Sequence, residues 1–147
     1  MITYFDTSGL IKMYNSENKS DEVVALWNKS TYAITSILTY AEIMAVLGRK
    51  MQDKAITKSE YDKIIIKFDN DWKSFIVVDY SSSIFKLTKD LTAKYYLRGF
   101  DAVHLASAKY WIDIQEDKKL IFSCYDNKLL KAAEKEKLIV SYMYTND

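Results

Sequence analysis

The chain has 147 residues, a formal net charge of +1 and 49% hydrophobic residues. This length fits a single domain, residues 1–147, and the apolar content is sufficient for a substantial core. Proline is absent and glycine occurs only three times, which argues against flexible linkers and a second domain. The near-neutral charge excludes an overtly basic nucleic-acid-binding protein, although local fields of both signs can still arise.

Cysteine usage and hydropathy indicate where the protein works. Cys124 is the single cysteine, so an internal disulfide or a cysteine-only zinc site is excluded, and a reducing compartment is the simplest interpretation. The N-terminus lacks a basic segment followed by a long apolar one, so we expect no signal peptide. No apolar run is long enough to span a bilayer. We therefore expect a cytoplasmic protein that makes no use of a membrane.

Short apolar segments alternate with amphipathic helical segments along the chain. The pattern predicts, in order, a strand over 2–5, a helix from residue 10, a helix after the polar residues 18–22, a strand over 32–35, helices over 37–52 and 58–73 that form a hairpin, a strand over 75–78, helices over 81–96 and 101–112, a strand over 120–123, a helix from residue 126 and a strand over 138–140.

This alternation predicts an α/β fold. Strands joined through helices need crossover connections, which favour a parallel sheet. Right-handed crossovers place helices on both faces and the carboxyl ends of the strands along one edge. We therefore expect a three-layer α/β/α sandwich with a mainly parallel five-stranded sheet. The pattern does not give the order of the strands.

Three aspartates fall at predicted element boundaries. Asp6 follows the first strand, whose wholly apolar character suits a position covered on both faces. In open α/β sheets this edge is where ligands bind. Asp101 and Asp126 stand at or near predicted helix starts. Each of the three is also plausible as a plain helix cap, Asp126 especially, because Asp accepts hydrogen bonds from free helix N–H groups.

Glu42 is not explained as a cap, because it lies inside a predicted helix. Its helical neighbours Leu38, Ala45 and Val46 are apolar. An ionised, unpaired carboxylate in such surroundings would carry a large desolvation cost. Two interpretations stay open from the helix pattern alone: a buried ion pair with Lys, Arg or Tyr, or a functional ligand.

One hypothesis covers all four acids, namely that they converge on a divalent cation. Carboxylates brought together repel one another and need a compensating charge. Their hard oxygens suit Mg²⁺, with Mn²⁺ as a substitute. Zinc is less favoured, because only His104 and Cys124 offer softer ligands. A metal held by such a cluster can activate water for phosphodiester hydrolysis.

The segments that carry these acids resemble PIN-domain ribonucleases, and the compact size is similar to the VapC-type toxins of toxin–antitoxin pairs. The matching segments are FDTSGLIK at 5–12, TYAE at 39–42, DAVHLA at 101–106 and YDNKL at 125–129. The resemblance implies a PIN-like sandwich of helices around a parallel sheet, Mg²⁺ or Mn²⁺ dependence and endoribonuclease activity. It also implies homodimers and inhibition by a small cognate antitoxin protein.

The resemblance also implies a role for individual residues. Asp6, Glu42 and Asp101 look like the core that holds the metal, and Asp126 looks like the fourth acid, which often acts through water. Ser8 resembles a position that hydrogen-bonds these carboxylates. Independently of the resemblance, Lys12 would meet a phosphate or pair with Glu42, unless it is a solvated helix lysine.

One position departs from the family pattern. Two residues before the last Asp the family usually has Thr or Ser, and this chain has Cys124. A thiol is a weak hydrogen-bond donor. The local support of Asp126 is therefore expected to differ, with Ser123 as a substitute.

The remaining polar and aromatic candidates have structural interpretations as well. His104 lies among apolar helix residues, which favours a packed structural histidine over a general base. Arg98 would contact RNA or an acidic partner, or form a surface ion pair. Tyr95, Tyr96, Tyr142 and Tyr144 would stack on bases or, more simply, pack in a core or a dimer interface.

The sequence thus predicts a metal-dependent endoribonuclease that acts on single-stranded or loop RNA and leaves 5′-phosphate and 3′-hydroxyl ends. One alternative is a non-catalytic RNA- or protein-binding module on the same fold. Another is a phosphotransfer enzyme with Asp6 as nucleophile. Haloacid-dehalogenase-like enzymes need a second Asp two positions on, where this chain has Ser8.

Overall fold

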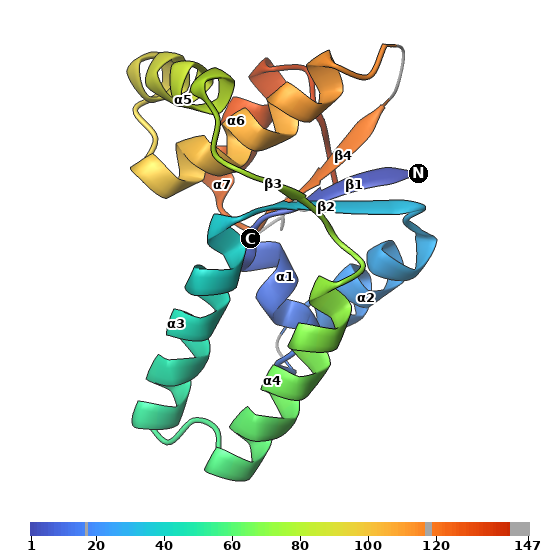
Figure 1. The fold of residues 1–147 in the computed structure, drawn as a ribbon, viewed down its shortest axis with the longest axis vertical. Coiled ribbons are helices and arrows are strands. Elements are labelled where there is room, and N and C mark those ends of the chain that lie inside the picture. Colours follow the sequence, from blue (N-terminus) through green and yellow to red (C-terminus); the bar gives the residue numbers. More distant parts are fainter. Residues whose placement is uncertain (17, 117–118, 142–147) are drawn as a thin grey trace.

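The computed structural model describes residues 1–16, 18–116 and 119–141. Five parallel strands form one sheet in the order β3-β2-β1-β4-β5 (Figure 1). The strands are β1 (Ile2–Phe5), β2 (Tyr32–Ser36), β3 (Ile76–Val78), β4 (Leu120–Ser123) and β5 (Ile139–Val140). The helices are α1 (Thr7–Leu10), the 3₁₀ helix η1 (Ile11–Met13), α2 (Ser20–Lys29), α3 (Leu38–Gln52), α4 (Lys58–Trp72), α5 (Ser82–Tyr95), α6 (Gly99–Asp113) and α7 (Asn127–Lys135).

Helices cover both faces of the sheet. Figure 1 shows α5, α6 and α7 on one side and α1 to α4 on the other, with α3 and α4 extending away as a hairpin. Two apolar clusters fill the spaces between these layers. Tyr4 belongs to one cluster and its neighbour Phe5 to the other, because successive side chains of a strand point to opposite faces. The predicted three-layer α/β/α sandwich with a parallel five-stranded sheet is confirmed.

Two helices begin earlier than the sequence pattern predicted. The first helical turn begins at Thr7 rather than at residue 10, because the Asp6 side chain accepts the Gly9 N–H and caps it. Helix α6 begins at Gly99, so Asp101 lies within its first turn and is not its N-cap. The apolar spacing used for the prediction starts only where the helix meets the core, which explains both shifts.

The strand order decides what lies at the functional edge. From β1 the chain moves outward through β2 and β3, and then returns to place β4 on the other side of β1. The carboxyl ends of β1 and β4 therefore form a topological switch point, where open α/β sheets bind ligands. Asp6 directly follows β1, and Asp126 follows β4.

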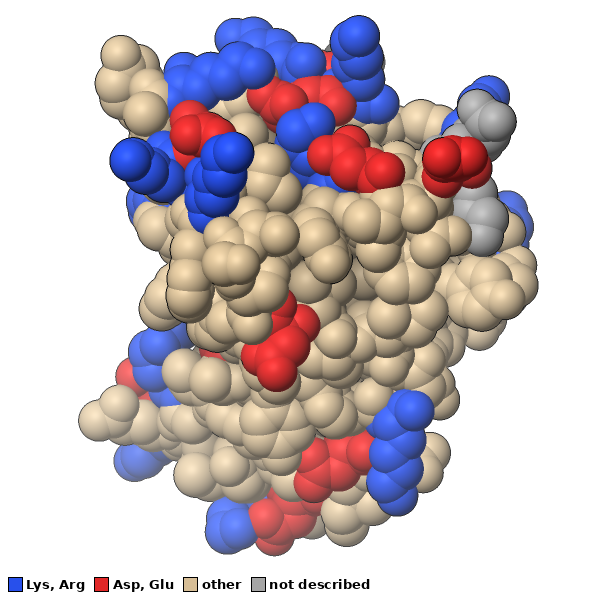
Figure 2. Space-filling model, turned by 45° about the horizontal axis from the view of Figure 1, so that its top comes forward, with Lys and Arg blue, Asp and Glu red and all other residues tan. Residues whose placement is uncertain are grey.

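One face of the molecule carries surface charge of both signs. On the face shown in Figure 2, Lys and Arg are interspersed with Asp and Glu toward the two ends, and the band between carries few charges. This face has no continuous basic track.

Within the described ranges, no helix combines the length and the apolar character needed to cross a bilayer.

Candidate active site

Asp6 is a buried acid fixed by its own turn. Its side chain is 4% exposed and accepts the Gly9 N–H at 2.8 Å and the Ser8 hydroxyl at 2.8 and 2.9 Å. Burial raises the pKa of Asp6, and the charge of His104 and the Gly9 and Ser8 hydrogen bonds oppose that rise. Asp6 is therefore a helix cap and, at the same time, a carboxylate held ready at the switch point.

Glu42 on α3 is paired with a histidine from the opposite layer. Its Oε1 lies 2.7 Å from His104 Nε2 and accepts the Thr7 hydroxyl at 2.8 Å. Burial alone would raise the pKa of Glu42, but the hydrogen bond and charge of His104, with Thr7, leave it lowered. An ionised carboxylate only accepts hydrogen bonds, so the Nε2 of His104 carries the proton.

His104 is itself held in place through its other ring nitrogen. Its side chain is 2% exposed, and its Nδ1 lies 2.9 Å from the hydroxyl of Tyr4, which is fully buried on β1. The prediction of a buried, packed histidine is therefore confirmed. The structure adds that both ring nitrogens are used and that one of them orients Glu42.

Arg98 links the other two acids. Its Nε lies 2.9 Å from Asp101 Oδ2, and its Nη2 lies 3.8 Å from Asp126 Oδ2. Asp126 also caps α7 by accepting the Leu129 N–H at 2.9 Å. The Arg98 side chain is 79% exposed, so this ion pair forms at the open side of the site and solvent weakens it.

Cys124 supports Asp126 as an acceptor. The Asp126 N–H points at its Sγ at 3.2 Å, and the Ser8 hydroxyl lies 3.8 Å from the same sulfur. Burial raises the pKa of the Cys124 thiol well above its ordinary value, so the sulfur stays neutral. The expectation that Ser123 substitutes is wrong, because its buried hydroxyl has no hydrogen-bond partner in the described part of the chain.

All four acids line one pocket of about 320 Å³ at the carboxyl ends of the strands. Its lining residues are Asp6, Thr7, Ser8, Ile11, Glu42, Val46, Arg98, Asp101, His104, Tyr125 and Asp126. Lys12 is not among these residues, but its Nζ lies 4.5 Å from the centre of the ring of Tyr125, which is, and contacts the Asn18 carbonyl at 3.3 Å.

The donor types suit a hard divalent cation, since the pocket offers carboxylate and hydroxyl oxygens. Whether these side chains are close enough together to bind one ion is a separate question. Across residues 1–16, 18–116 and 119–141, no three His, Cys, Asp or Glu side chains form a compact metal-binding group. Three of the acids are instead paired within the protein, Asp101 and Asp126 with Arg98 and Glu42 with His104. The convergence of the four acids on one ion stays a prediction.

Sequence reasoning missed the partners of the acids. Thr7 and Tyr4 were not singled out, although Thr7 directly follows Asp6. Arg98 forms a surface ion pair, which was one of the two interpretations. Its partners Asp101 and Asp126 both belong to the pocket. His104 stands three positions after Asp101, and this spacing places both on one side of a helix. That signal was present in the sequence.

Of the four tyrosines considered for base stacking, one makes a structural contact and one is exposed. Tyr95 donates its hydroxyl to Glu136 at 2.5 Å, a contact between α5 and the end of α7. Tyr96 is 80% exposed and has left-handed backbone angles after α5. Tyr142 and Tyr144 lie outside the described residues.

A model of the PIN domain family matches residues 3–135 of the chain. The protein belongs to the PIN domain family. Two curated relatives are each 30% identical over 128 residues, covering 87% of this PIN domain protein and 86% of their own length. They are ribonucleases VapC45 and VapC49, from two strains of Mycobacterium tuberculosis.

Solved structures share the fold of this PIN domain protein. FitAcB from Neisseria gonorrhoeae has a TM-score of 0.72 at 13% identity, covering 98% of this chain and 99% of that one. A toxin–antitoxin complex from Klebsiella pneumoniae has a TM-score of 0.66 at 20% identity, covering 97% and 98%. VapBC2 from Rickettsia felis, bound to a promoter DNA fragment, has a TM-score of 0.62 at 16% identity, covering 96% and 98%.

Proposed function

We propose that this PIN domain protein is a Mg²⁺- or Mn²⁺-dependent endoribonuclease and the toxin of a toxin–antitoxin pair. The observation that carries the proposal is the pocket at the sheet switch point, which Asp6, Glu42, Asp101 and Asp126 all line. The curated relatives are named ribonucleases, which supports RNA as the substrate.

Asp6, Glu42, Asp101 and Asp126 are the residues that would hold the cation. A bound Mg²⁺ or Mn²⁺ would activate water and offset the charge of the scissile phosphate. The protein's own contribution is to keep its acids ionised and oriented. Ser8 and Gly9 fix Asp6, and His104 fixes Glu42.

Arg98 supplies positive charge at the open side of the pocket. Its guanidinium balances Asp101 and Asp126 when the acids stand alone. If a bound cation balanced those acids instead, the Arg98 guanidinium would be available to a phosphate oxygen, since guanidinium groups pair with phosphate as well as with carboxylate.

The proposed partners follow from the same comparisons. Two structural neighbours are named as toxin–antitoxin or VapBC2 complexes, which supports a small cognate antitoxin for this chain. We further propose a homodimer, and single-stranded or loop RNA as the substrate, because unpaired bases and their phosphates can enter a pocket of this size.

The test is cleavage of total RNA with Mg²⁺, with Mn²⁺ and with EDTA. We expect metal-dependent cleavage that leaves 5′-phosphate ends. Asp6→Asn should abolish it, because Asn retains the helix cap but loses the charge. Glu42→Gln should reduce it by about tenfold or more at low metal. Asp90→Asn, an exposed change on α5, is the matched control and should retain activity.

Two results would contradict the proposal. A folded Asp6→Asn variant with full metal-dependent activity would remove the site. RNA binding without cleavage in any metal would favour the non-catalytic binding module instead.

A further inference from the structure

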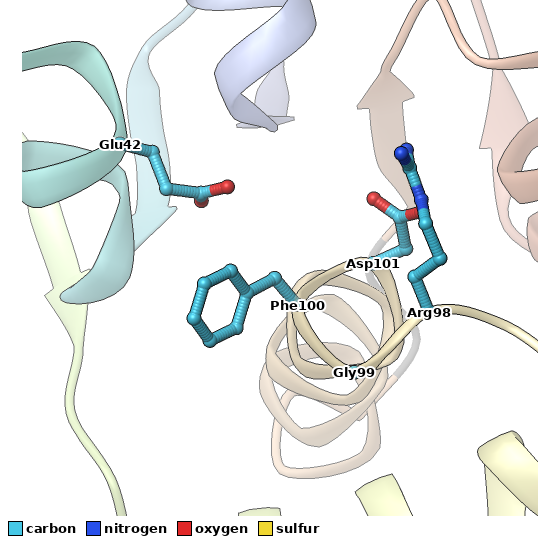
Figure 3. Close-up of a pocket in the computed structure, with 5 residues that line it drawn as sticks. All are labelled: Glu42, Arg98, Gly99, Phe100 and Asp101. Atoms are coloured by element: carbon cyan, nitrogen blue, oxygen red, sulfur yellow. The ribbon is translucent and has the colours of Figure 1, made fainter. Parts of the chain in front are cut away.

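A second hollow opens beside the acids. It encloses about 380 Å³ and is lined by Glu42, Arg98, Gly99, Phe100 and Asp101 (Figure 3). Three of these residues also line the pocket that holds all four acids. The two hollows therefore adjoin each other at the start of α6.

Phe100 presents its ring to this hollow. Figure 3 shows the ring on the side of α6 that faces Glu42, with Asp101 and Arg98 on the other side of the same helical turn. The side chain is 57% exposed, although the next turns of α6 are buried. Beside it, Gly99 leaves the space open, since a Cβ there would meet nothing within 4 Å.

Two further aromatic side chains are exposed between the end of β3 and the first turns of α5. Tyr80 is 39% exposed. Its ring lies 5.4 Å from that of Phe85, which is 59% exposed. Of the residues that line the hollow, Phe100 carries the aromatic ring, and exposed aromatic rings are typical platforms on which bases stack.

The net charge of this protein provides little electrostatic attraction for RNA. The net charge is +1, and the face in Figure 2 carries no continuous basic track. Proteins that bind single strands without such a track need more of their affinity from stacking, because stacking does not depend on phosphate neutralisation.

We propose that the hollow between Glu42 and Phe100 is a nucleobase subsite, in which an unpaired base beside the scissile phosphate stacks on the Phe100 ring. The inference rests on the proposed ribonuclease function and deepens it. It selects single-stranded RNA, because a base inside a duplex cannot reach the ring. An RNA occupant is favoured over a protein, since the hollow shares Glu42, Arg98 and Asp101 with the acid pocket.

The test compares Phe100→Leu, Phe100→Tyr and the control Tyr32→Leu, each combined with Asp6→Asn so that RNA is bound without being cut. Tyr32 is an exposed aromatic residue at the opposite edge of the sheet. The probe is a fluorescein-labelled single-stranded RNA of about eight nucleotides, with a set of copies that each lack one base. Binding is measured by fluorescence anisotropy in Mg²⁺.

We expect Phe100→Leu to weaken binding of the intact RNA by about tenfold, and Phe100→Tyr and Tyr32→Leu to leave it within about twofold. One probe of the set should bind equally well with and without the Phe100→Leu change, because the base that stacks is already missing from that probe. Thermal unfolding and solution mass should be unchanged by Phe100→Leu.

Three results would overturn the inference. If Phe100→Leu and Tyr32→Leu bound RNA equally well, the proposed subsite would be rejected. The proposed ribonuclease function would stand, provided that Asp6→Asn still abolishes cleavage. A change in solution mass with Phe100→Leu, without a change in RNA binding, would assign the ring to a protein interface. Failure of the protein with unaltered acids to bind or cut any RNA would remove the proposed function as well.

Discussion

At the scale of single residues, Glu42 depends on a contact that crosses the sheet. His104 lies in the layer of α6, Glu42 belongs to α3 on the other face, and Tyr4 of the central strand holds the far ring nitrogen. A carboxylate oriented in this way can present its second oxygen to a ligand. Partners that orient a metal ligand typically affect metal affinity by about 10- to 100-fold.

Two isosteric substitutions separate this orienting role from simple packing. Glutamine at position 104 can place an amide N–H near Nε2, whereas asparagine reaches only the Nδ1 position. We expect His104→Asn to weaken Mn²⁺ binding by about tenfold or more, and His104→Gln to retain it within about threefold. Isothermal titration with Mn²⁺, alongside thermal unfolding without metal, measures the two effects. Equal metal affinity for both variants at similar stability would reduce His104 to a packing residue.

At the scale of elements, the turn from β1 into α1 lies directly against the end of β4. The Asp6 N–H donates to the Ser123 carbonyl at 3.1 Å. A Cβ on Gly9 would lie 2.9 Å from that same carbonyl oxygen and 3.4 Å from Asp6 Oδ1. Only glycine fits between the two segments, so the residue is required by close approach and not by its backbone angles.

Gly9→Ala should therefore destabilise the protein, by about 1–3 kcal/mol, because backbone atoms must move apart. Gly48→Ala is the matched control, since Gly48 lies inside α3 and a Cβ there meets nothing within 4 Å. It should stabilise the protein by about 0.5–1 kcal/mol through better helix propensity. Urea unfolding of both variants gives the comparison. A neutral Gly9→Ala would show that β4 can shift without cost.

At the scale of the whole molecule, the fold gathers negative charge and balances it internally. Four acids line one pocket, and Arg98 and His104 pair with three of them. Asp6 accepts hydrogen bonds from the neutral groups of Ser8 and Gly9, and burial raises its pKa although the charge of His104 opposes the rise. A cation that binds only the folded protein would offset the cost of burying this carboxylate and stabilise the folded state.

We expect Mg²⁺ or Mn²⁺ at a hundred times its dissociation constant to add about 2.7 kcal/mol of stability. For a domain of this size the melting temperature should rise by about 5–10 °C, and EDTA should reverse the rise. Asp6→Asn should lose the shift without lowering the melting temperature in EDTA, because Asn caps the helix and adds no buried charge. Scanning calorimetry with and without metal measures both. Absence of any shift at millimolar metal would speak against a metal site.

The sequence by itself determined the parts of this protein that depend on local chemistry. Hydrophobic periodicity located all five strands to within a residue or two, and the three aspartates were placed at strand ends or helix starts by their neighbours alone. These features follow from hydrogen bonds and side-chain spacing within a few residues. The class of fold followed, because alternating strands and helices admit few parallel arrangements.

The tertiary structure alone decided the strand order, the partners of each acid and the space left at Gly9. The bond between Tyr4 and His104 joins residues 100 positions apart, and the bond between His104 and Glu42 spans 62. No local pattern encodes such contacts, because they arise only when packing against the sheet brings two layers together. The charge balance of the candidate site is for that reason a property of the packed fold.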